Sequence, residues 1–293
     1  MTKINIMALR HSAFYSPLLI SISGGFLKEE GLEPHYEVQT PARTVVDTIR
    51  MGETHVAQSA VATSFAALEA DEEVDIVHFA QINERDGFFI AGREKNNQFQ
   101  WTDLVGSEVL VDHFFQPLAM FKYACHKQGV NFADIKVIDA GDVAAIDKAF
   151  RSDQGQFVHQ QGPAPQQIEQ DGAGYVVASV GEAIGPVAFS SLCAHRDWLK
   201  TDMARAFMRA YRKARQFTIE TPSSELAKLL GDFLPDITSD VLIKTLETYK
   251  QLGCWTPQVE ISKPAYETLL DVFLHSGDIQ QRHPYQAAIV SPP

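Results

Sequence analysis

The sequence has few cysteines, no basic run and no long apolar segment. Its 293 residues include three cysteines, Cys125, Cys193 and Cys254, and no two of them have CxxC spacing. This pattern excludes a disulfide framework and offers no cysteine-based zinc site. No apolar segment approaches the roughly 18 residues that a membrane-spanning helix needs. We therefore expect no direct membrane insertion.

Basic residues are outnumbered by acidic ones. The chain has 25 Lys and Arg against 37 Asp and Glu, which gives a formal net charge of −12 at pH 7. An acidic protein repels the phosphate backbone of nucleic acids, so we expect no nucleic-acid partner. Hydrophobic residues make up 45% of the chain, as in ordinary globular proteins, and this excludes a disordered chain.

The first ten residues contain neither a long apolar segment nor the small-residue cleavage site of a signal peptide. They lead directly into a predicted strand. On this ground we expect a cytoplasmic protein, and the alternative is a periplasmic protein whose leader has been removed.

Short apolar segments alternate with amphipathic segments along residues 4–79, which predicts strands separated by helices and hence a parallel α/β sheet. Gly31 and Gly52 are placed to end two of the helices. The predicted strands are 4–8, 36–38, 55–58 and 74–79, and the predicted helices are 15–30, 42–51 and 60–69.

The same order recurs about 100 residues later, which indicates an internal repeat. One continuous α/β sheet is the alternative. The strands of the second set are predicted at 109–111, 135–138, 157–159 and 175–180, and its helices at 118–127, 144–150 and 164–169. The remainder is predicted to be helical at 200–218, 224–234, 239–251 and 263–276.

Two strand-like segments with flanking glycines, 86–93 and 184–192, bound the second repeat. Two crossings of the chain between two lobes make a hinge. The C-terminal helices need an apolar surface, and we expect them to return to the first lobe. The predicted fold is therefore α/β with two lobes and two hinge-crossing strands: lobe I comprises residues 1–88 and 190–293, and lobe II comprises residues 89–189.

Ligands of open α/β sheets bind beyond the carboxyl ends of the strands. This rule selects loops 10–15, 58–63, 112–116 and 159–163, together with the second crossing. The loops combine aromatic side chains with neutral hydrogen-bonding groups, which suits a small planar molecule with some polar groups. For a single residue the alternative is structural: a lone Phe after a strand more often belongs to the core, and a lone His is more often a satisfied loop residue. The candidate ligand-binding residues are His11, Ser12, Phe14, Tyr15, Ser59, Ala60, Thr63, His113, Phe114, Phe115, Gln116, Gln160, Gly162 and Gly185.

Arg85 follows the strand predicted at 74–79 and is a further candidate ligand-binding residue. A guanidinium group binds a carboxylate, sulfonate or phosphate through paired hydrogen bonds. The alternative is a surface ion pair with Glu84 or Asp86.

Catalytic and cofactor signatures are weak. The sequence has no GxSxG, HExxH, P-loop or GxGxxG motif, and its ten histidines show no pair at metal-ligand spacing. Cys193 ends an apolar segment, which favours an inert buried thiol over a nucleophile. We predict no catalytic residue, metal site or cofactor.

Four segments carry a resemblance to a known family: Tyr15 to Leu18 (YSPL), 25–33 (GFLKEEGLE), 51–57 (MGETHVA) and 101–107 (WTDLVGS). They resemble substrate-binding proteins of ABC transporters of the nitrate/sulfonate/taurine type, a superfamily that includes thiamine-pyrimidine-synthase-like proteins. The resemblance extends over nearly the whole chain. It implies the two-lobed periplasmic-binding-protein-like (type II) fold, a small-molecule ligand in the cleft and an ABC transporter permease as partner.

Two enzymatic branches of this superfamily differ at the matching positions. The thiamine-pyrimidine synthases carry a substrate histidine near Ala62 and a cysteine cluster where this chain has only Cys193. The aryl-sulfinate desulfinases have an arginine turn that residues 85–89 resemble, but this chain lacks their nucleophilic cysteine within residues 11–15. Both departures argue against those activities.

The leading interpretation is a solute-binding protein that clamps a small, aromatic or heteroaromatic ligand between two lobes, with an acidic group on the ligand as an option. The alternative is an enzyme on a desulfinase-like or synthase-like scaffold that uses His11, His113 or His159 as acid or base. A cytoplasmic sensor remains a third interpretation.

Overall fold

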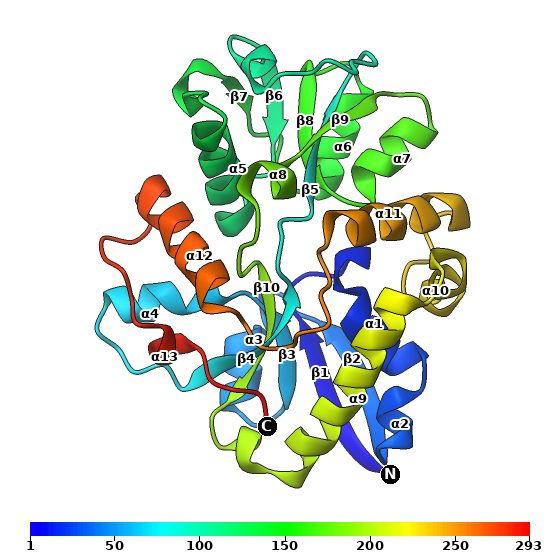
Figure 1. The fold of residues 1–293 in the computed structure, drawn as a ribbon, viewed down its shortest axis with the longest axis vertical. Helices are drawn as coiled ribbons and strands as arrows, with labels where there is room; N and C mark the ends of the chain where they lie inside the picture. The colour runs from blue at the N-terminus through cyan, green and yellow to red at the C-terminus, as the bar shows by residue number, and fades with distance from the viewer.

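The computed structural model, which describes residues 1–293, contains two five-stranded sheets in the orders β2-β1-β3-β10-β4 and β7-β6-β8-β5-β9. Figure 1 shows one sheet in each of two stacked lobes, with helices around both. The first sheet contains β1 (Thr2–Ala8), β2 (Leu32–Val38), β3 (Val56–Ser59), β4 (Ile76–Asn83) and β10 (Ser190–His195). The second contains β5 (Phe88–Gly92), β6 (Glu108–Val111), β7 (Lys136–Ile138), β8 (Phe157–Gln161) and β9 (Tyr175–Ser179).

Each sheet has four strands that run in parallel and one that runs against them. In the first sheet β10 is antiparallel to both β3 and β4. In the second, β5 is antiparallel to both β8 and β9. The α/β two-lobed fold is confirmed, but the expectation of a purely parallel sheet is wrong. The antiparallel strand of each sheet starts at the cleft because it arrives there from the other lobe.

The chain passes between the sheets at residues 84–87, which join β4 to β5, and at residues 185–189. The second crossing follows the short helix α8 (Val180–Ile184), which the sequence did not predict. The predicted strand at 184–192 is wrong in its first half, because β10 begins only at Ser190. Gly181 of α8 packs on the first crossing: a Cβ atom at Gly181 would lie 2.3 Å from the carbonyl oxygen of Asp86.

The helix predicted at 15–30 is interrupted. It forms α1 (Ser16–Ser23) and α2 (Phe26–Glu29), because Gly25 between them has a φ of +80°, which lies outside the helical region. The helix predicted at 60–69 is a 3₁₀ turn followed by α4 (Phe65–Glu69). The other helices are α3 (Val45–Arg50), α5 (Phe115–Lys127), α6 (Val143–Arg151), α7 (Ala164–Gln170), α9 (Asp202–Glu220), α10 (Ser223–Leu230), α11 (Ser239–Leu252), α12 (Lys263–Ser276) and α13 (Tyr285–Ala288). No helix combines the length and the hydropathy needed to cross a bilayer.

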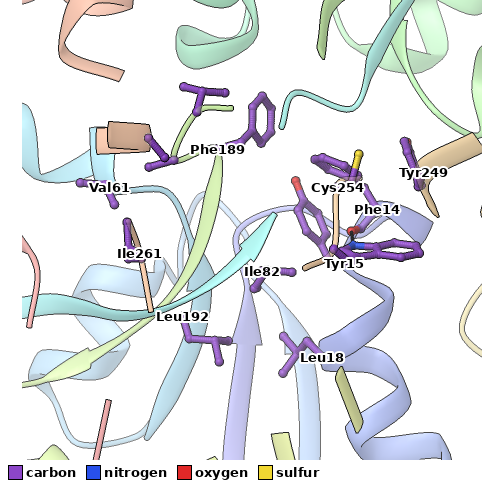
Figure 2. Close-up of a cluster of buried hydrophobic side chains, with 14 of the residues drawn as sticks. Phe14, Tyr15, Leu18, Val61, Ile82, Phe189, Leu192, Tyr249, Cys254 and Ile261 are labelled. Carbon is purple, nitrogen blue, oxygen red and sulfur yellow. Dashed lines mark hydrogen bonds between the residues drawn. The ribbon is translucent and has the colours of Figure 1, made fainter. Parts of the chain in front are cut away.

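The main hydrophobic core continues through the hinge. Its 64 buried residues include Ile4 of β1 and Val109 of β6, which belong to different sheets. Figure 2 shows how Phe14, Phe189 and Tyr249 approach one another from three separate segments. The ring centroid of Phe14 lies 5.4 Å from that of Phe189 and 4.7 Å from that of Tyr249. The hinge is therefore a packed apolar region rather than a pair of exposed linkers.

Two C-terminal helices of the first lobe also touch the second lobe (Figure 1). Helix α12 packs on α5, where the rings of Phe273 and Phe115 are 4.9 Å apart. Helix α11 packs on α7, and an ion pair joins Lys244 to Glu169. These contacts hold the lobes in a closed arrangement.

The close approach at Gly181 gives a stability prediction. Gly181→Ala should lower the free energy of unfolding by about 1–3 kcal/mol, because the new methyl group meets the Asp86 backbone, which cannot swing away. The control is Gly231→Ala, where the nearest atoms to a Cβ are 3.7 Å away and no loss is expected. Urea denaturation measures both. Equal stability of the two variants would contradict the packing described.

Candidate functional site

A small cavity lies between the two lobes, where the carboxyl ends of β1, β3, β6 and β8 meet. Its volume is about 30 Å³. A buried water molecule needs about 10–15 Å³, so the closed cleft has room for about two. A larger hollow of about 320 Å³ lies on the first lobe against α3 and α4, away from the cleft. The residues that line the cleft cavity are Leu9, Arg10, Tyr15, Gln58, Ala60, Phe114, Gln116, Pro117, Gln161, Phe189 and Ser190.

An ion pair spans the cleft. The guanidinium Nη2 of Arg10, which follows β1, donates to Oδ2 of Asp112, which follows β6, over 2.7 Å. The side chains of Arg10 and Asp112 are 23% and 7% exposed. The rings of Phe88 and Phe114 lie 5.8 and 5.4 Å from the guanidinium carbon, within the range of cation–π attraction. The cleft therefore presents one positive and one negative group, one from each lobe.

Two buried amide groups in the cleft have atoms without a hydrogen-bond partner. Nε2 of Gln116 donates to the carbonyl oxygen of Phe189 over 2.8 Å, which fixes the orientation of this amide and leaves its Oε1 unpaired. Nε2 of Gln161 is also unpaired. A buried polar atom that lacks a partner is costly, so such atoms commonly mark a place that water or a ligand occupies.

Tyr15 lies on the floor of the same cavity. Burial raises the pKa of its hydroxyl, while the nearby side chains of Gln161 and Ser190 and the charge of Arg10 partly oppose this rise. The hydroxyl is therefore neutral and serves as a hydrogen-bonding group.

Backbone carbonyl groups accept further hydrogen bonds between the lobes. The carbonyl oxygen of Gly162 accepts a hydrogen bond from the Ser12 hydroxyl over 3.0 Å. The Tyr249 hydroxyl lies 3.0 Å from the same oxygen and 3.2 Å from the carbonyl oxygen of Gly87, and its single proton serves one of them at a time. A Cβ atom at residue 162 would lie 2.6 Å from the Tyr249 oxygen, so this contact requires glycine.

The structure brings four of the predicted site residues to the cavity: Tyr15, Ala60, Phe114 and Gln116. Ser12 and Gly162 lie beside it and bond to each other. Phe14 is fully buried in the hydrophobic core, where Figure 2 shows it among other apolar side chains.

The three candidate acid–base histidines do not converge. His11 uses both ring nitrogens within the first lobe, at 2.8 Å from the Tyr36 hydroxyl and 2.6 Å from the Phe233 carbonyl. His113 bonds through Nδ1 to the carbonyl oxygen of Val111, 2.8 Å away. Neither His11 nor His113 lines the cavity.

His159 is sealed in an aromatic sandwich. Its ring stacks at 4.7 Å from Phe88 and 4.6 Å from Phe121, and both ring nitrogens are buried without a partner. Burial lowers the pKa of His159 from 6.5 to about 3. The imidazole is therefore neutral at physiological pH, and it does not line the cavity.

Gln160 lies on the face of β8 opposite to the cavity. Its Nε2 is 3.4 Å from the carbonyl oxygen of Val143. Successive side chains of a strand point to opposite faces, so the cavity receives Gln161 in place of Gln160. Gln160 therefore does not line the cavity, whereas its neighbour in the same predicted loop does.

The remaining candidates make contacts outside the cavity. The hydroxyls of Ser59 and Thr63 are 3.3 Å apart. Arg85 donates to the carbonyl oxygen of Gly181 over 3.3 Å, which is neither of the two partnerships expected for it. Phe115 packs on Phe273, as described above, and Gly185 ends α8 with a φ of +86°.

Sequence reasoning missed several residues of the cavity. Arg10 and Gln58 stand directly at the ends of β1 and β3, so the position rule covered them, but neither was chosen. Phe189 and Ser190 belong to the second crossing, where only Gly185 was selected. The missed residues are Leu9, Arg10, Gln58, Pro117, Gln161, Phe189 and Ser190. No three or more His, Cys, Asp or Glu side chains are arranged to hold a metal ion.

His159 gives a prediction about acid stability. The unfolded histidine titrates near 6.5 and the folded one near 3, so the unfolded chain binds more protons between these values and the stability contributed here falls as the pH drops from about 7 to about 4. His159→Phe keeps the stacking and removes both unpaired nitrogens. It should be as stable as the wild type at pH 7, or up to about 2 kcal/mol more stable, and should lose less stability on acidification.

Urea denaturation at neutral and acidic pH measures this effect. His35→Phe, at an exposed position of β2, serves as the control and should keep the acid sensitivity of the wild type. If the His159→Phe variant loses as much stability on acidification as the wild type does, the description of His159 as a buried, neutral histidine is wrong.

Comparisons with known proteins agree with this architecture. A model of the family described as NMT1/THI5 like matches residues 13–225. The curated protein named "Putative binding protein YtlA" from Bacillus subtilis (strain 168) is 28% identical over 293 residues, which cover 99% of this chain and 88% of that protein.

Two solved structures share the fold. The periplasmic aliphatic sulphonate binding protein SsuA from Escherichia coli has a TM-score of 0.78 at 13% identity, covering 99% of this chain and 97% of that one. The alkanesulfonate-binding protein SsuA from Xanthomonas axonopodis pv. citri, bound to MOPS, has a TM-score of 0.75 at 14% identity, covering 99% of both chains. The resemblance to sulfonate-type substrate-binding proteins is confirmed.

The expectation of a cytoplasmic location is wrong. It is contradicted by the comparisons, in which the fold neighbour from Escherichia coli is a periplasmic binding protein. The expectation rested on the first ten residues, and seven of these form β1 inside the first sheet. They belong to the folded lobe.

Proposed function

Since the chain belongs to the NMT1/THI5-like family, we propose that it is the solute-binding component of an ABC import system, closing two lobes on a small molecule. The observation that carries this proposal is the cavity between the lobes, which both lobes line. The names of the relatives agree with it: one is a binding protein and two bind sulfonates. The partners are the ligand and a transporter permease.

The two lobes that move against each other are residues 1–88 with 190–293, and residues 89–189. Side-chain bonds from Ser12 and Tyr249 to backbone carbonyl groups of the opposite lobe or hinge support closure without constraining the ligand. Hinge-bending binders enclose their ligands in this manner.

The ligand is small and aromatic or heteroaromatic, with an acidic group. Tyr15, Phe114 and Phe189 give the cavity aromatic walls, which favour a planar partner. Arg10 is the cation that faces the cavity, in the role that the sequence suggested for Arg85. A guanidinium group binds a carboxylate or sulfonate through two parallel hydrogen bonds.

The geometry does not favour the enzymatic alternative. An acid–base mechanism would need one of His11, His113 or His159 at the cavity, and the first two are bonded to protein groups while the third is sealed between rings. No other observation supports turnover.

The test is a ligand screen of the whole chain. Thermal-shift measurements with aromatic carboxylates, aromatic sulfonates and pyrimidines, followed by calorimetry, should identify a ligand that raises the melting temperature with one site per chain. Chemical change of a ligand in place of reversible binding, or no binding across all three classes, would overturn the proposal.

Two adjacent phenylalanines provide a matched test of the cavity. Phe114 is 50% exposed and lines the cavity, whereas Phe115 is 45% exposed and packs on Phe273. Phe114→Ala should lower the affinity for the ligand found in the screen roughly tenfold, which corresponds to about 1.4 kcal/mol, because an aromatic contact is removed. Phe115→Ala should change the affinity by less than about threefold. Calorimetry measures both, and the reverse order would place the ligand elsewhere.

A further inference from the structure

The closed cleft has no room for a ligand while Arg10 and Asp112 touch. The cavity beside them measures about 30 Å³, whereas sites for small organic ligands enclose about 300 Å³ or more. The lobes must therefore stand farther apart around a ligand than they do in this structure. Because Arg10 and Asp112 come from opposite lobes, this separation breaks their 2.7 Å contact.

Separation leaves two opposite charges without each other: Arg10, which lines the cavity, and Asp112, whose Oδ1 accepts a hydrogen bond from the Phe114 amide over 2.9 Å and whose Oδ2 loses Arg10. Neither Arg10 nor Asp112 has another ion-pair partner, and the Asp112 carboxylate is 7% exposed. An anion alone would satisfy Arg10 and leave Asp112 buried beside a second negative charge, and a cation alone would leave Arg10 unpaired. The net charge of −12 adds to the cost of a purely anionic ligand.

On the basis of the proposed solute-binding function, we infer that the ligand is a small aromatic zwitterion and that the Arg10–Asp112 pair selects it. The acidic group of the ligand binds Arg10, and its protonated amine or ring nitrogen donates to Asp112. The aromatic part lies between Tyr15 and Phe114. The ligand thus replaces the direct ion pair with two ion pairs of its own.

The unpaired amide atoms fit the same ligand class. Oε1 of Gln116 is a free acceptor and Nε2 of Gln161 is a free donor, and both residues line the cavity. The Gln116 side chain is more than nine-tenths buried, so its free oxygen needs a donor from the ligand or from water. A molecule with both donor and acceptor groups matches this arrangement better than a simple aromatic acid does.

The experiment compares three probes of one skeleton by calorimetry at neutral pH: para-aminomethylbenzoate, para-methylbenzoate and para-methylbenzylamine. The first is a zwitterion, the second an anion and the third a cation. The wild type should bind the zwitterion about tenfold or more tightly than either other probe. In the Asp112→Asn variant, the preference for the zwitterion over the anion should fall by about tenfold, because the bound anion no longer lies near a carboxylate. In the Arg10→Gln variant, the preference for the zwitterion over the cation should fall in the same way, because the cation no longer lies near a guanidinium group.

Asp153→Asn is the matched control. Asp153 lies on the second lobe with a 98% exposed side chain, so its replacement makes the same change in net charge far from the cleft. The ratio of affinities for the three probes should not change. Thermal melting followed by circular dichroism confirms that each variant is folded. If the Asp112→Asn variant does not fold, the Arg10→Gln variant provides the test.

The outcomes separate this inference from the function on which it depends. If the anion binds most tightly and Asp112→Asn leaves its advantage unchanged, the zwitterion inference fails and the solute-binding function stands. If none of the three probes binds while another compound of the wider screen does, the zwitterion inference also fails and the solute-binding function stands. If no compound of the screen binds, the proposed function itself fails.

Discussion

The cleft exists because the chain passes between its two sheets in only two places, and each passage supplies an antiparallel strand to the sheet it enters. The other strands of each sheet then end where the crossing strand begins. The carboxyl ends of β1 and β3 consequently face those of β6 and β8. Every polar group in the cavity occupies its place as a result of this arrangement, including Arg10 after β1 and Asp112 after β6.

The hinge that carries these crossings is packed, and its polar atoms are deeply buried. Asp86 in the first crossing is fully buried, with Oδ1 accepting from the backbone amide of Phe88 over 2.6 Å and Oδ2 unpaired. Burial raises the pKa of Asp86 to about 7. Gly181 and Gly87 permit this packing, since a Cβ atom would collide with the Asp86 backbone at one and with the Phe14 ring at the other. The two crossings are therefore a well-packed region and not loose linkers.

Much of the fold could be predicted because it depends on local patterns. Alternating strands and helices, the glycines that end helices and the repeat of about 100 residues all have short-range physical causes. The direction of β5 and β10 has no short-range cause, because it depends on which lobe the preceding residue occupies. Helix α8 spans five residues, too short for an amphipathic period to show.

The site was predicted at the level of loops and less well at the level of side chains. Each of the four loops selected by the rule that ligands bind beyond strand ends supplies at least one residue that lines the cavity. Within a loop, the choice depends on the strand face and on tertiary partners. Gln161 lines the cavity instead of Gln160 because successive side chains of a strand point to opposite faces. His11 does not line it, because its ring nitrogens bond to the Tyr36 hydroxyl and to the carbonyl oxygen of Phe233, a residue distant in sequence. Arg10 was passed over because nothing local distinguishes it from Arg85.

The narrowness of the closed cavity also governs the timing of binding. A molecule larger than two waters cannot enter while Arg10 meets Asp112 and Ser12 meets Gly162. Each association event must then await an opening of the lobes. The observed association rate should cease to rise with ligand concentration once it equals the rate of opening, so the contacts between the lobes set the highest speed at which this protein captures its ligand.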